Sequence, residues 1–126
     1  MKKTLNRIFV VDDYPDIGMM LKLMLEYHGY DVFVTERAEK AEGIIHNEHF
    51  DMLIMDMLMS GINGTDICSR LKKDKTTATL PVIMISAHPN AREICIGAGA
   101  DEFMAKPFDM DELMLKIHTF LPQPVK

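Results

Sequence analysis

The sequence predicts an α/β domain in which helices cover both faces of a five-stranded parallel sheet, a doubly wound fold. Along the 126 residues, five short apolar segments alternate with five amphipathic ones. The apolar segments are hydrophobic at nearly every position, which is typical of parallel strands that helices bury on both faces. Because crossovers between parallel strands are right-handed, this alternation predicts a sandwich. The length suits one domain spanning residues 1–126, with its core at about residues 7–121.

The predicted strands are short runs rich in β-branched side chains and bounded by polar residues. The first strand stops at Asp12 and Asp13. The third stops at Asp56, and a loop rich in glycine, serine and asparagine follows from Ser60 to Gly64. The five strands occupy residues 7–11, 31–35, 52–55, 82–85 and 102–105.

The predicted helices carry apolar residues at helical spacing. In the first helix Pro15 suits the opening turn, Met20 falls on the apolar face, and Gly29 ends the helix. The last helix runs to residue 121, and Asp109 stands at its N-cap position, three residues before Glu112. The other helices occupy about residues 38–48, 67–75 and 90–97.

Composition and charge exclude several classes of function. Hydrophobic residues make up 48% of the chain and charged residues 26%, which is ordinary for a soluble globular protein. No apolar run approaches the ~20 residues that span a bilayer, and no hydrophobic stretch follows the basic residues 1–3 as in a signal peptide. We therefore expect a cytoplasmic protein that contacts no membrane. The formal net charge is −5, and no basic stripe interleaves with aromatic residues, so we expect no direct binding to nucleic acid.

Polar residues follow four of the predicted strands, at the point where each strand ends. They are Asp12, Asp13, Asp56, Ser86 and Lys106. In a doubly wound sheet, ligands bind in a crevice beyond the carboxyl ends of the strands. We therefore expect three carboxylates, a hydroxyl and an ammonium to converge on one pocket.

Three gathered carboxylates need a positive counter-charge. Aspartates after strands often cap the next helix, which could explain Asp12 or Asp13 alone, but not three aspartates in one pocket. Two carboxylates ~5 Å apart repel by about 3 kcal/mol at an effective dielectric constant of 20. Lys106 supplies one positive charge. A hard divalent cation supplies two more and prefers oxygen ligands, and Mg²⁺, which takes one or two carboxylates plus phosphate oxygens, suits this set.

The same set suits transfer of a phosphoryl group to a carboxylate. Carboxylates form acyl-phosphate intermediates. Phosphoryl transfer requires mainly positioning and stabilisation of charge on three equatorial oxygens, which the cation, Lys106 and the Ser86 hydroxyl can supply. No histidine is placed as a general base at these strand ends. The pattern therefore favours a phosphorylated aspartate over a hydrolase that activates water.

These residues resemble the receiver domains of two-component response regulators, over roughly residues 7–121. The resemblance depends on short motifs that occur in the family's order at near-family spacing. They are Asp12-Asp13, Asp56, Ser86-Ala87, Lys106-Pro107, Gly99-Ala100-Asp101 before the fifth strand, and Asp56-Met57-Leu58-Met59 leading to Gly64. The resemblance implies a flavodoxin-like strand order 2-1-3-4-5 and a single-domain, chemotaxis-regulator-like protein of two-component signal transduction.

The resemblance also implies residue roles and partners. Asp56 would accept the phosphoryl group from a sensor histidine kinase or a phosphotransfer protein, and a downstream effector protein would read the change. Asp13, Asp56 and the backbone carbonyl of Leu58 would ligate Mg²⁺ or Mn²⁺, with Asp12 acting mainly through bound water. Lys106 would contact the phosphoryl oxygens, through a cis Lys106-Pro107 peptide. Such a switch is not an enzyme beyond slow self-dephosphorylation.

For the switch itself, the resemblance implies that Ser86 moves toward the phosphoryl group while Phe103 turns inward. The chain departs from the family pattern at three points. Ser60 stands where proline is usual, which predicts a less rigid loop. Phe103 lacks the hydroxyl of a tyrosine. The stretch between Ser86 and Lys106 is slightly shorter than usual, which predicts a short or distorted fourth helix and argues against a family-type dimer through that face. We therefore expect a monomer or a weak dimer.

Two other functions remain open from the sequence. One is an atypical receiver that acts as a docking module independent of phosphorylation, which the intact five-residue set argues against. The other is a small phosphatase with Asp56 as its nucleophile, which the lack of a substrate-specificity segment and of a general base argues against. The segment 122–124, Pro-Gln-Pro, is typical of a domain end or of the start of a linker, so the chain could be a stand-alone regulator or part of a longer protein.

Overall fold

The five-stranded parallel sheet that the sequence predicts is present in the computed structural model, which describes residues 5–121. Its strand order is β2-β1-β3-β6-β7, which is the predicted order 2-1-3-4-5 once a small separate hairpin, β4-β5, is set aside. The strands of the large sheet are β1 (Arg7–Val11), β2 (Asp31–Thr35), β3 (Met52–Asp56), β6 (Val82–Ser86) and β7 (Glu102–Ala105). The predicted domain end at residues 122–124 and the basic residues 1–3 lie outside the described residues.

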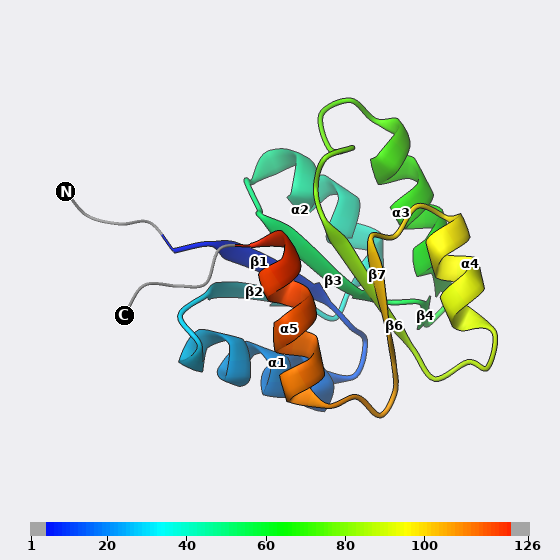
Figure 1. Cartoon of the computed structure of the whole chain (residues 1–126). Coiled ribbons are helices and arrows are strands. Elements are labelled where there is room, and N and C mark those ends of the chain that lie inside the picture. Colours follow the sequence, from blue (N-terminus) through cyan, green and yellow to red (C-terminus); the bar gives the residue numbers. More distant parts are fainter. Residues whose placement is uncertain (1–4, 122–126) are drawn as a thin grey trace.

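Five α-helices alternate with these strands. They are α1 (Pro15–Tyr27), α2 (Ala41–Asn47), α3 (Gly64–Lys73), α4 (Ala91–Gly97) and α5 (Met110–Phe120), and a short 3₁₀ turn, η1 (Ala38–Lys40), leads into α2. Figure 1 shows α1 and α5 together on one side of the sheet and α2, α3 and α4 on the other. The doubly wound sandwich is therefore confirmed. Helix α4 has only seven residues, as the short stretch between Ser86 and Lys106 predicts.

The core has two halves, one on each face of the sheet. In β1, Ile8 and Val10 pack among side chains of α1 and α5, whereas Phe9 and Val11 pack among those of α2, α3 and α4. Each of these four side chains is at most 1% exposed. Burying one such side chain contributes about 1.5–3 kcal/mol. The strands are therefore apolar at nearly every position because both of their faces are covered.

Two local predictions were wrong. Met20 is 42% exposed, because the face of α1 that meets the sheet is formed by Gly18, Leu21 and Leu25. The segment from Ser60 to Gly64, predicted as a loop, instead contains the turn and second strand of a hairpin formed by β4 (Leu58–Met59) and β5 (Ile62–Asn63), and its last residue begins α3. Gly61 takes a positive φ of 72° in its turn, which glycine adopts at low cost.

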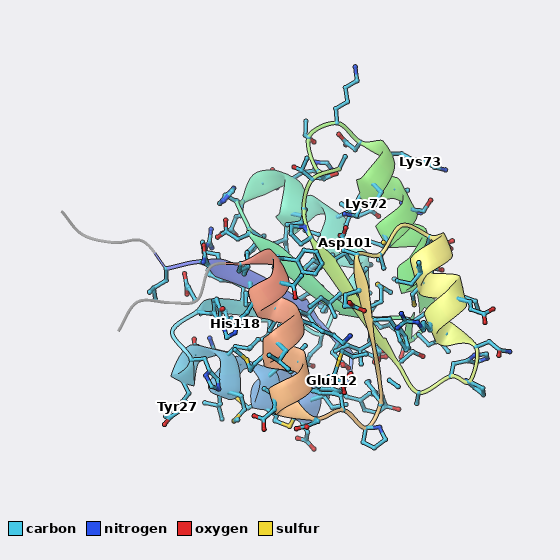
Figure 2. All side chains as sticks on the ribbon, in the orientation of Figure 1. Tyr27, Lys72, Lys73, Asp101, Glu112 and His118 are labelled. Carbon is cyan, nitrogen blue, oxygen red and sulfur yellow. The ribbon has the colours of Figure 1, made fainter. Side chains whose placement is uncertain are left out.

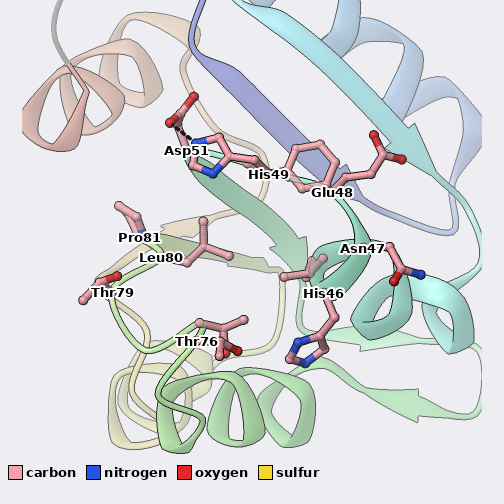
Figure 3. A pocket seen from close by; sticks show the side chains of 12 residues that line it. His46, Asn47, Glu48, His49, Asp51, Thr76, Thr79, Leu80 and Pro81 are labelled. Atoms are coloured by element: carbon pink, nitrogen blue, oxygen red, sulfur yellow. Dashed lines mark hydrogen bonds and ion pairs between the residues drawn. The ribbon is translucent and has the colours of Figure 1, made fainter.

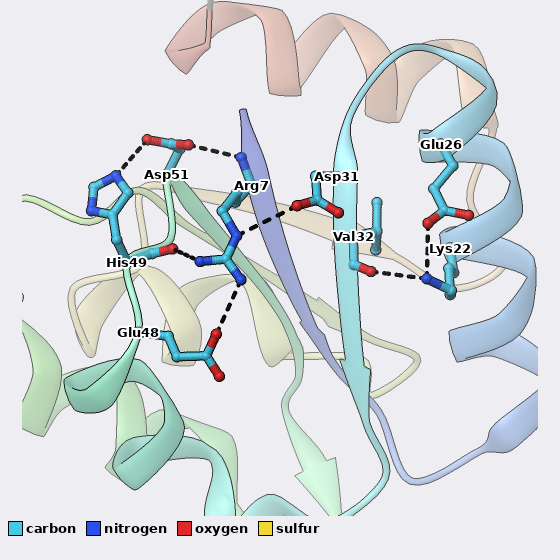
Figure 4. A network of polar contacts seen from close by, with 8 residues as sticks. All are labelled: Arg7, Lys22, Glu26, Asp31, Val32, Glu48, His49 and Asp51. Carbon is cyan, nitrogen blue, oxygen red and sulfur yellow. Dashed lines mark hydrogen bonds and ion pairs between the residues drawn. The ribbon is translucent and has the colours of Figure 1, made fainter. Parts of the chain in front are cut away.

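Contacts around Arg7 tie the amino ends of the strands together (Figure 4). The Arg7 amide donates a hydrogen bond to Asp51 Oδ2 at 2.7 Å. Its guanidinium lies 3.5 Å from Asp31 Oδ2 and 3.1 Å from Glu48 Oε1, and it stacks 4.5 Å from the centroid of the Phe33 ring. One side chain thus joins β1, β2 and the connection from α2 to β3.

A second tie joins α3 to β6 and β7. Lys72 Nζ lies 2.7 Å from Asp101 Oδ2 and donates to the Leu80 carbonyl at 2.7 Å. The Asp101 carboxylate also accepts a hydrogen bond from the Val82 amide at 2.8 Å. Figure 2 shows Lys72 and Asp101 close together, where the chain enters β7. Asp101 of the Gly-Ala-Asp motif therefore anchors the amino ends of β6 and β7.

A hollow of about 530 Å³ lies at this amino edge of the sheet (Figure 3). Phe50, Leu80 and Pro81 are among its lining residues, together with His46 and His49. It lies at the opposite end of the strands from Asp12, Asp13 and Asp56, because residues 50 and 81 precede β3 and β6. Within residues 5–121, no helix has the length and apolar character needed to cross a bilayer.

Candidate functional site

Three carboxylates meet at the carboxyl edge of the sheet, as the sequence predicts. One oxygen from each of Asp12, Asp13 and Asp56 lies within 4.8 Å of the others. Asp12 and Asp13 directly follow β1, and Asp56 is the last residue of β3. Because β1 and β3 are neighbours in the sheet, their carboxyl ends bring together residues that are more than forty positions apart in the chain. We call these three residues the acidic cluster.

Asp12 is the most deeply buried member of the acidic cluster, at 2% exposure. Its Oδ1 accepts a hydrogen bond from the Tyr14 amide at 2.9 Å. Burial raises the pKa of Asp12 above its ordinary value, and the charge of Asp56 raises it further, whereas the Tyr14 amide and the positive charge of Lys106 lower it. The net direction is upward, so the Asp12 carboxylate is held in an unfavourable setting for a negative charge.

Asp13 is oriented by the loop that follows β3. Its Oδ2 accepts two hydrogen bonds from Ser60, one from the amide at 2.8 Å and one from the hydroxyl at 3.0 Å. Its Oδ1 is buried and has no hydrogen-bond partner among residues 5–121. A buried carboxylate oxygen without a partner is costly in a folded protein, unless a ligand or an ion completes it.

Lys106 supplies the positive charge opposite the acidic cluster. It follows β7, and its Nζ lies 3.1 Å from Asp56 Oδ2 and 3.5 Å from Asp12 Oδ2. The Tyr14 ring lies beside the ammonium, with its centroid 5.6 Å from Nζ, which is within cation–π range. The Lys106-Pro107 peptide bond is cis, as the resemblance implies.

The start of α3 packs closely against the end of β3 at Asp56. The Gly64 amide donates a hydrogen bond to the Met57 carbonyl at 2.6 Å. A Cβ at Gly64 would lie 2.5 Å from the backbone oxygen of Asp56, closer than carbon and oxygen can approach. Glycine therefore lets the start of α3 approach the end of β3, and this approach helps to fix the position of Asp56.

The other predicted site residues are Ser86, Leu58 and Phe103. Ser86, the last residue of β6, is buried, and its hydroxyl accepts a hydrogen bond from the His88 amide at 3.0 Å. Its carbonyl accepts from the Lys106 amide at 3.0 Å, so Ser86 lies between the ends of β3 and β7. Leu58 opens β4, two residues beyond Asp56, and its side chain is about half exposed. Phe103 in β7 is buried on the α2-α3-α4 face.

The donors of the acidic cluster fit a divalent cation. Three carboxylates face one ammonium, so the group carries two excess negative charges when all are ionised. Oxygen donors of this kind are the ligands that Mg²⁺ and Mn²⁺ prefer. The buried oxygen of Asp13 without a partner offers a ligand atom. Together these features give a site that can seat a cation and place a buried carboxylate, Asp56, beside a lysine.

Two residues at the site were missed by sequence reasoning. Ser60 was interpreted only as a loop residue where proline is usual, yet it donates both hydrogen bonds to Asp13. Tyr14 was not singled out, although its amide contacts Asp12 and its exposed ring flanks Lys106. For Tyr14 the available signal was its position directly after the acidic pair and before Pro15. For Ser60 the available signal was that serine has a backbone N–H group that can donate a hydrogen bond, whereas the proline usual at this position has none.

Comparison with known proteins agrees with this geometry. The family model described as the response regulator receiver domain matches residues 8–118. The phosphate regulon transcriptional regulatory protein PhoB of Rhizobium meliloti is 34% identical over 93% of this chain and 52% of its own length. The DNA-binding dual master transcriptional regulator RpaA of Synechocystis is 31% identical over 91% of this chain and 48% of its own length. The chain thus spans about half the length of these relatives.

Solved structures share the fold over nearly their whole length. The response regulator protein TrrA of Thermotoga maritima, solved in complex with Mg²⁺ and BeF, is 33% identical, with a TM-score of 0.84 over 93% of this chain and 100% of that one. A response regulator receiver domain protein of Clostridium thermocellum is 28% identical, with a TM-score of 0.83 over 91% of this chain and 93% of that one. The family match, the strand order and the acidic cluster agree, and the chain belongs to the response regulator receiver domain family of two-component signalling.

Proposed function

We propose that Asp56 accepts a phosphoryl group in a reaction that depends on Mg²⁺ or Mn²⁺, and that phosphorylation switches the binding of a downstream effector protein. The observation that carries this proposal is a buried Asp56 carboxylate 3.1 Å from Lys106 Nζ, inside a cluster of three aspartates. Receiver domains are phosphoacceptor switches rather than enzymes in the ordinary sense, and they bind Mg²⁺ in an acidic pocket. They interact with histidine kinases or phosphotransfer proteins, so the proposed donor is a phosphohistidine on one of these.

In this proposal the acidic cluster holds the cation. Asp13, Asp56 and the backbone carbonyl of Leu58 are its ligands, and Asp12 acts through bound water. When bound, the divalent ion neutralises charge on the oxygens of the transferred group. The excess of two negative charges around Lys106 supports this assignment, because a divalent ion balances that excess.

The chain's own residues then carry out the transfer. An oxygen of the Asp56 carboxylate attacks the phosphorus, the bond from phosphorus to the donor imidazole breaks, and the imidazole keeps the electron pair. Lys106 Nζ contacts the phosphoryl oxygens as charge builds on them. The Ser86 hydroxyl contacts another of these oxygens, giving up its hydrogen bond from the His88 amide or sharing it. Hydrolysis of the phosphorylated Asp56 by water returns the domain to its first state slowly.

The proposed switch couples Ser86 to Phe103. Ser86 moves toward the phosphoryl group, and the inward position of Phe103 is then favoured. Met84, which precedes Ser86 by two residues, pairs with Phe103 in the sheet, so a shift at the end of β6 has a short route to β7. We further propose that residues 1–126 form one receiver domain that works in the cytoplasm as a monomer or a weak dimer.

Intact-mass measurement after incubation with MgCl₂ and a small-molecule phosphodonor tests the proposal. Wild-type protein gains the mass of one phosphoryl group, and the gain disappears with EDTA. Asp56→Asn gains nothing, whereas Asp66→Asn, the same chemical change at an exposed position in α3, is labelled like wild type. No gain in wild type would favour a docking module independent of phosphorylation. Turnover of the donor by an unlabelled protein would indicate a phosphatase.

A further inference from the structure

Ser60 and Asp13 form a contact that joins two loops far apart in sequence. The Ser60 amide and the Ser60 hydroxyl both donate to Asp13 Oδ2, at 2.8 and 3.0 Å, across a separation of 47 residues. Asp13 belongs to the loop after β1, and Ser60 belongs to the turn between β4 and β5. Both loops border the acidic cluster, so this contact fixes their spacing at the site.

At two other places in the described part of the chain, the amide and the hydroxyl of one residue also donate to the same oxygen, but there both contacts are local. The amide and hydroxyl of Thr65 donate to Asn63 Oδ1, and those of Thr76 donate to Asp74 Oδ1. In both cases the acceptor lies only two residues earlier, which is the usual arrangement at a helix start or a turn. The Ser60 pair reaches across the site instead, so local turn geometry does not account for it.

The contact leaves one oxygen of Asp13 free for another partner. Oδ2 receives both hydrogen bonds, and Oδ1 is buried with no partner among the described residues. Asp13 also contributes an oxygen to the acidic cluster. We propose that Ser60 is a positioning residue, which orients the Asp13 carboxylate so that Oδ1 is presented to the divalent cation and thereby sets the cation affinity. This inference rests on the proposed function.

Ser60 has two opposite effects on cation binding by Asp13. Hydrogen bonds to Oδ2 draw charge from the carboxylate and weaken it as a ligand. They also fix its rotation, so that less conformational freedom is lost when a cation binds. Both hydrogen bonds fall on Oδ2 and leave Oδ1 without a partner among the described residues, and groups that orient metal ligands typically change metal affinity 10–100-fold when they are removed. Orientation is therefore the larger effect, and loss of Ser60 weakens binding.

Titration calorimetry with MgCl₂ tests this inference. Ser60→Ala removes the hydroxyl but keeps the amide, and weakens Mg²⁺ binding by about threefold to tenfold. Ser60→Pro removes both donors and weakens it by more than tenfold. Ser60→Thr keeps both donors and restores affinity to near that of wild type. Thr76→Ala, which removes a hydroxyl from the equivalent local pair, leaves affinity unchanged. Far-UV circular dichroism checks that each variant is folded.

A second measurement separates positioning from a general loss of structure. The rate of phosphoryl labelling is followed as MgCl₂ is varied. In Ser60→Ala the concentration needed for half the maximal rate rises with the dissociation constant, while the rate at saturating MgCl₂ stays within twofold of wild type. A lower rate at saturation with an unchanged half-point would overturn the inference, as would equal affinities of wild type, Ser60→Ala and Ser60→Pro. Absence of Mg²⁺ binding to wild type would instead overturn the proposed function.

Discussion

Replacing Asp12 with asparagine is expected to stabilise the metal-free protein. One oxygen of Asp12 lies within 4.8 Å of oxygens of Asp13 and Asp56, and each of these pairs repels by at least about 3.5 kcal/mol at an effective dielectric constant of 20. The attraction to Lys106 Nζ at 3.5 Å returns only about 4.7 kcal/mol on the same scale. Asparagine keeps an oxygen that can accept from the Tyr14 amide. A gain in stability of about 2 kcal/mol follows.

Urea unfolding followed by far-UV circular dichroism measures this gain, since the chain contains no tryptophan for fluorescence. In EDTA at neutral pH, Asp12→Asn should unfold at a urea concentration about 1 M higher than wild type, with an unchanged slope. Adding saturating MgCl₂ should narrow the difference or reverse it, because a bound cation stabilises the folded wild type and neutralises the repulsion. The exposed control Asp66→Asn should change the midpoint little. A midpoint for Asp12→Asn below that of wild type in EDTA would refute the electrostatic reasoning.

The stability difference between Asp12→Asn and wild type should depend on pH in a definite direction. Burial raises the pKa of Asp12 in the folded protein, so the folded state holds a proton more tightly at this position than the unfolded chain does. The penalty from the charged carboxylate is present above the folded pKa and is lost as the pH falls toward the ordinary value for aspartate, about 3.9. The advantage of Asp12→Asn over wild type in EDTA should therefore shrink as the pH is lowered through this window.

Two further substitutions test the packing described above. Tyr30→Phe should raise the free energy of unfolding by up to about 1 kcal/mol, because the Tyr30 hydroxyl is buried without a partner among residues 5–121; a loss of stability in urea unfolding would show that the hydroxyl has a partner. Gly64→Ala should lower the free energy of unfolding by about 1–3 kcal/mol and slow phosphoryl labelling, because its Cβ would meet the backbone oxygen of Asp56. Wild-type labelling kinetics in Gly64→Ala would contradict the close approach of α3.

The sequence was sufficient for the sheet and for most of the site because both follow from long-range rules. Apolar runs of strand length, alternating with helices, predict a parallel sheet, and a parallel sheet brings its strand ends to one edge. Lys106 and Asp12 are 94 positions apart and follow strands that are not neighbours, yet both strands end at the same edge of the sheet, and the two side chains lie 3.5 Å from each other. The roles of these residues in phosphorylation remain predictions.

The features that sequence reasoning missed depend on local backbone geometry. The Ser60–Asp13 contact requires a hairpin of only two residue pairs to turn back toward the loop after β1. Nothing in the periodicity of residues 57–63 specifies that direction. Met20 was misplaced for a related reason. Apolar residues surround much of α1, and spacing alone does not decide which of its faces the sheet covers.

The contacts around Arg7 have a practical consequence for altering the protein. They fasten β1, β2 and the entry to β3 at the amino edge, whereas the residues of the acidic cluster stand at the opposite edge. Sheet register and the proposed cation site therefore depend on separate groups of side chains. A designer could exchange the segment 57–63 to retune ion preference while Arg7 continues to secure the strand alignment, so the two properties can be optimised one at a time.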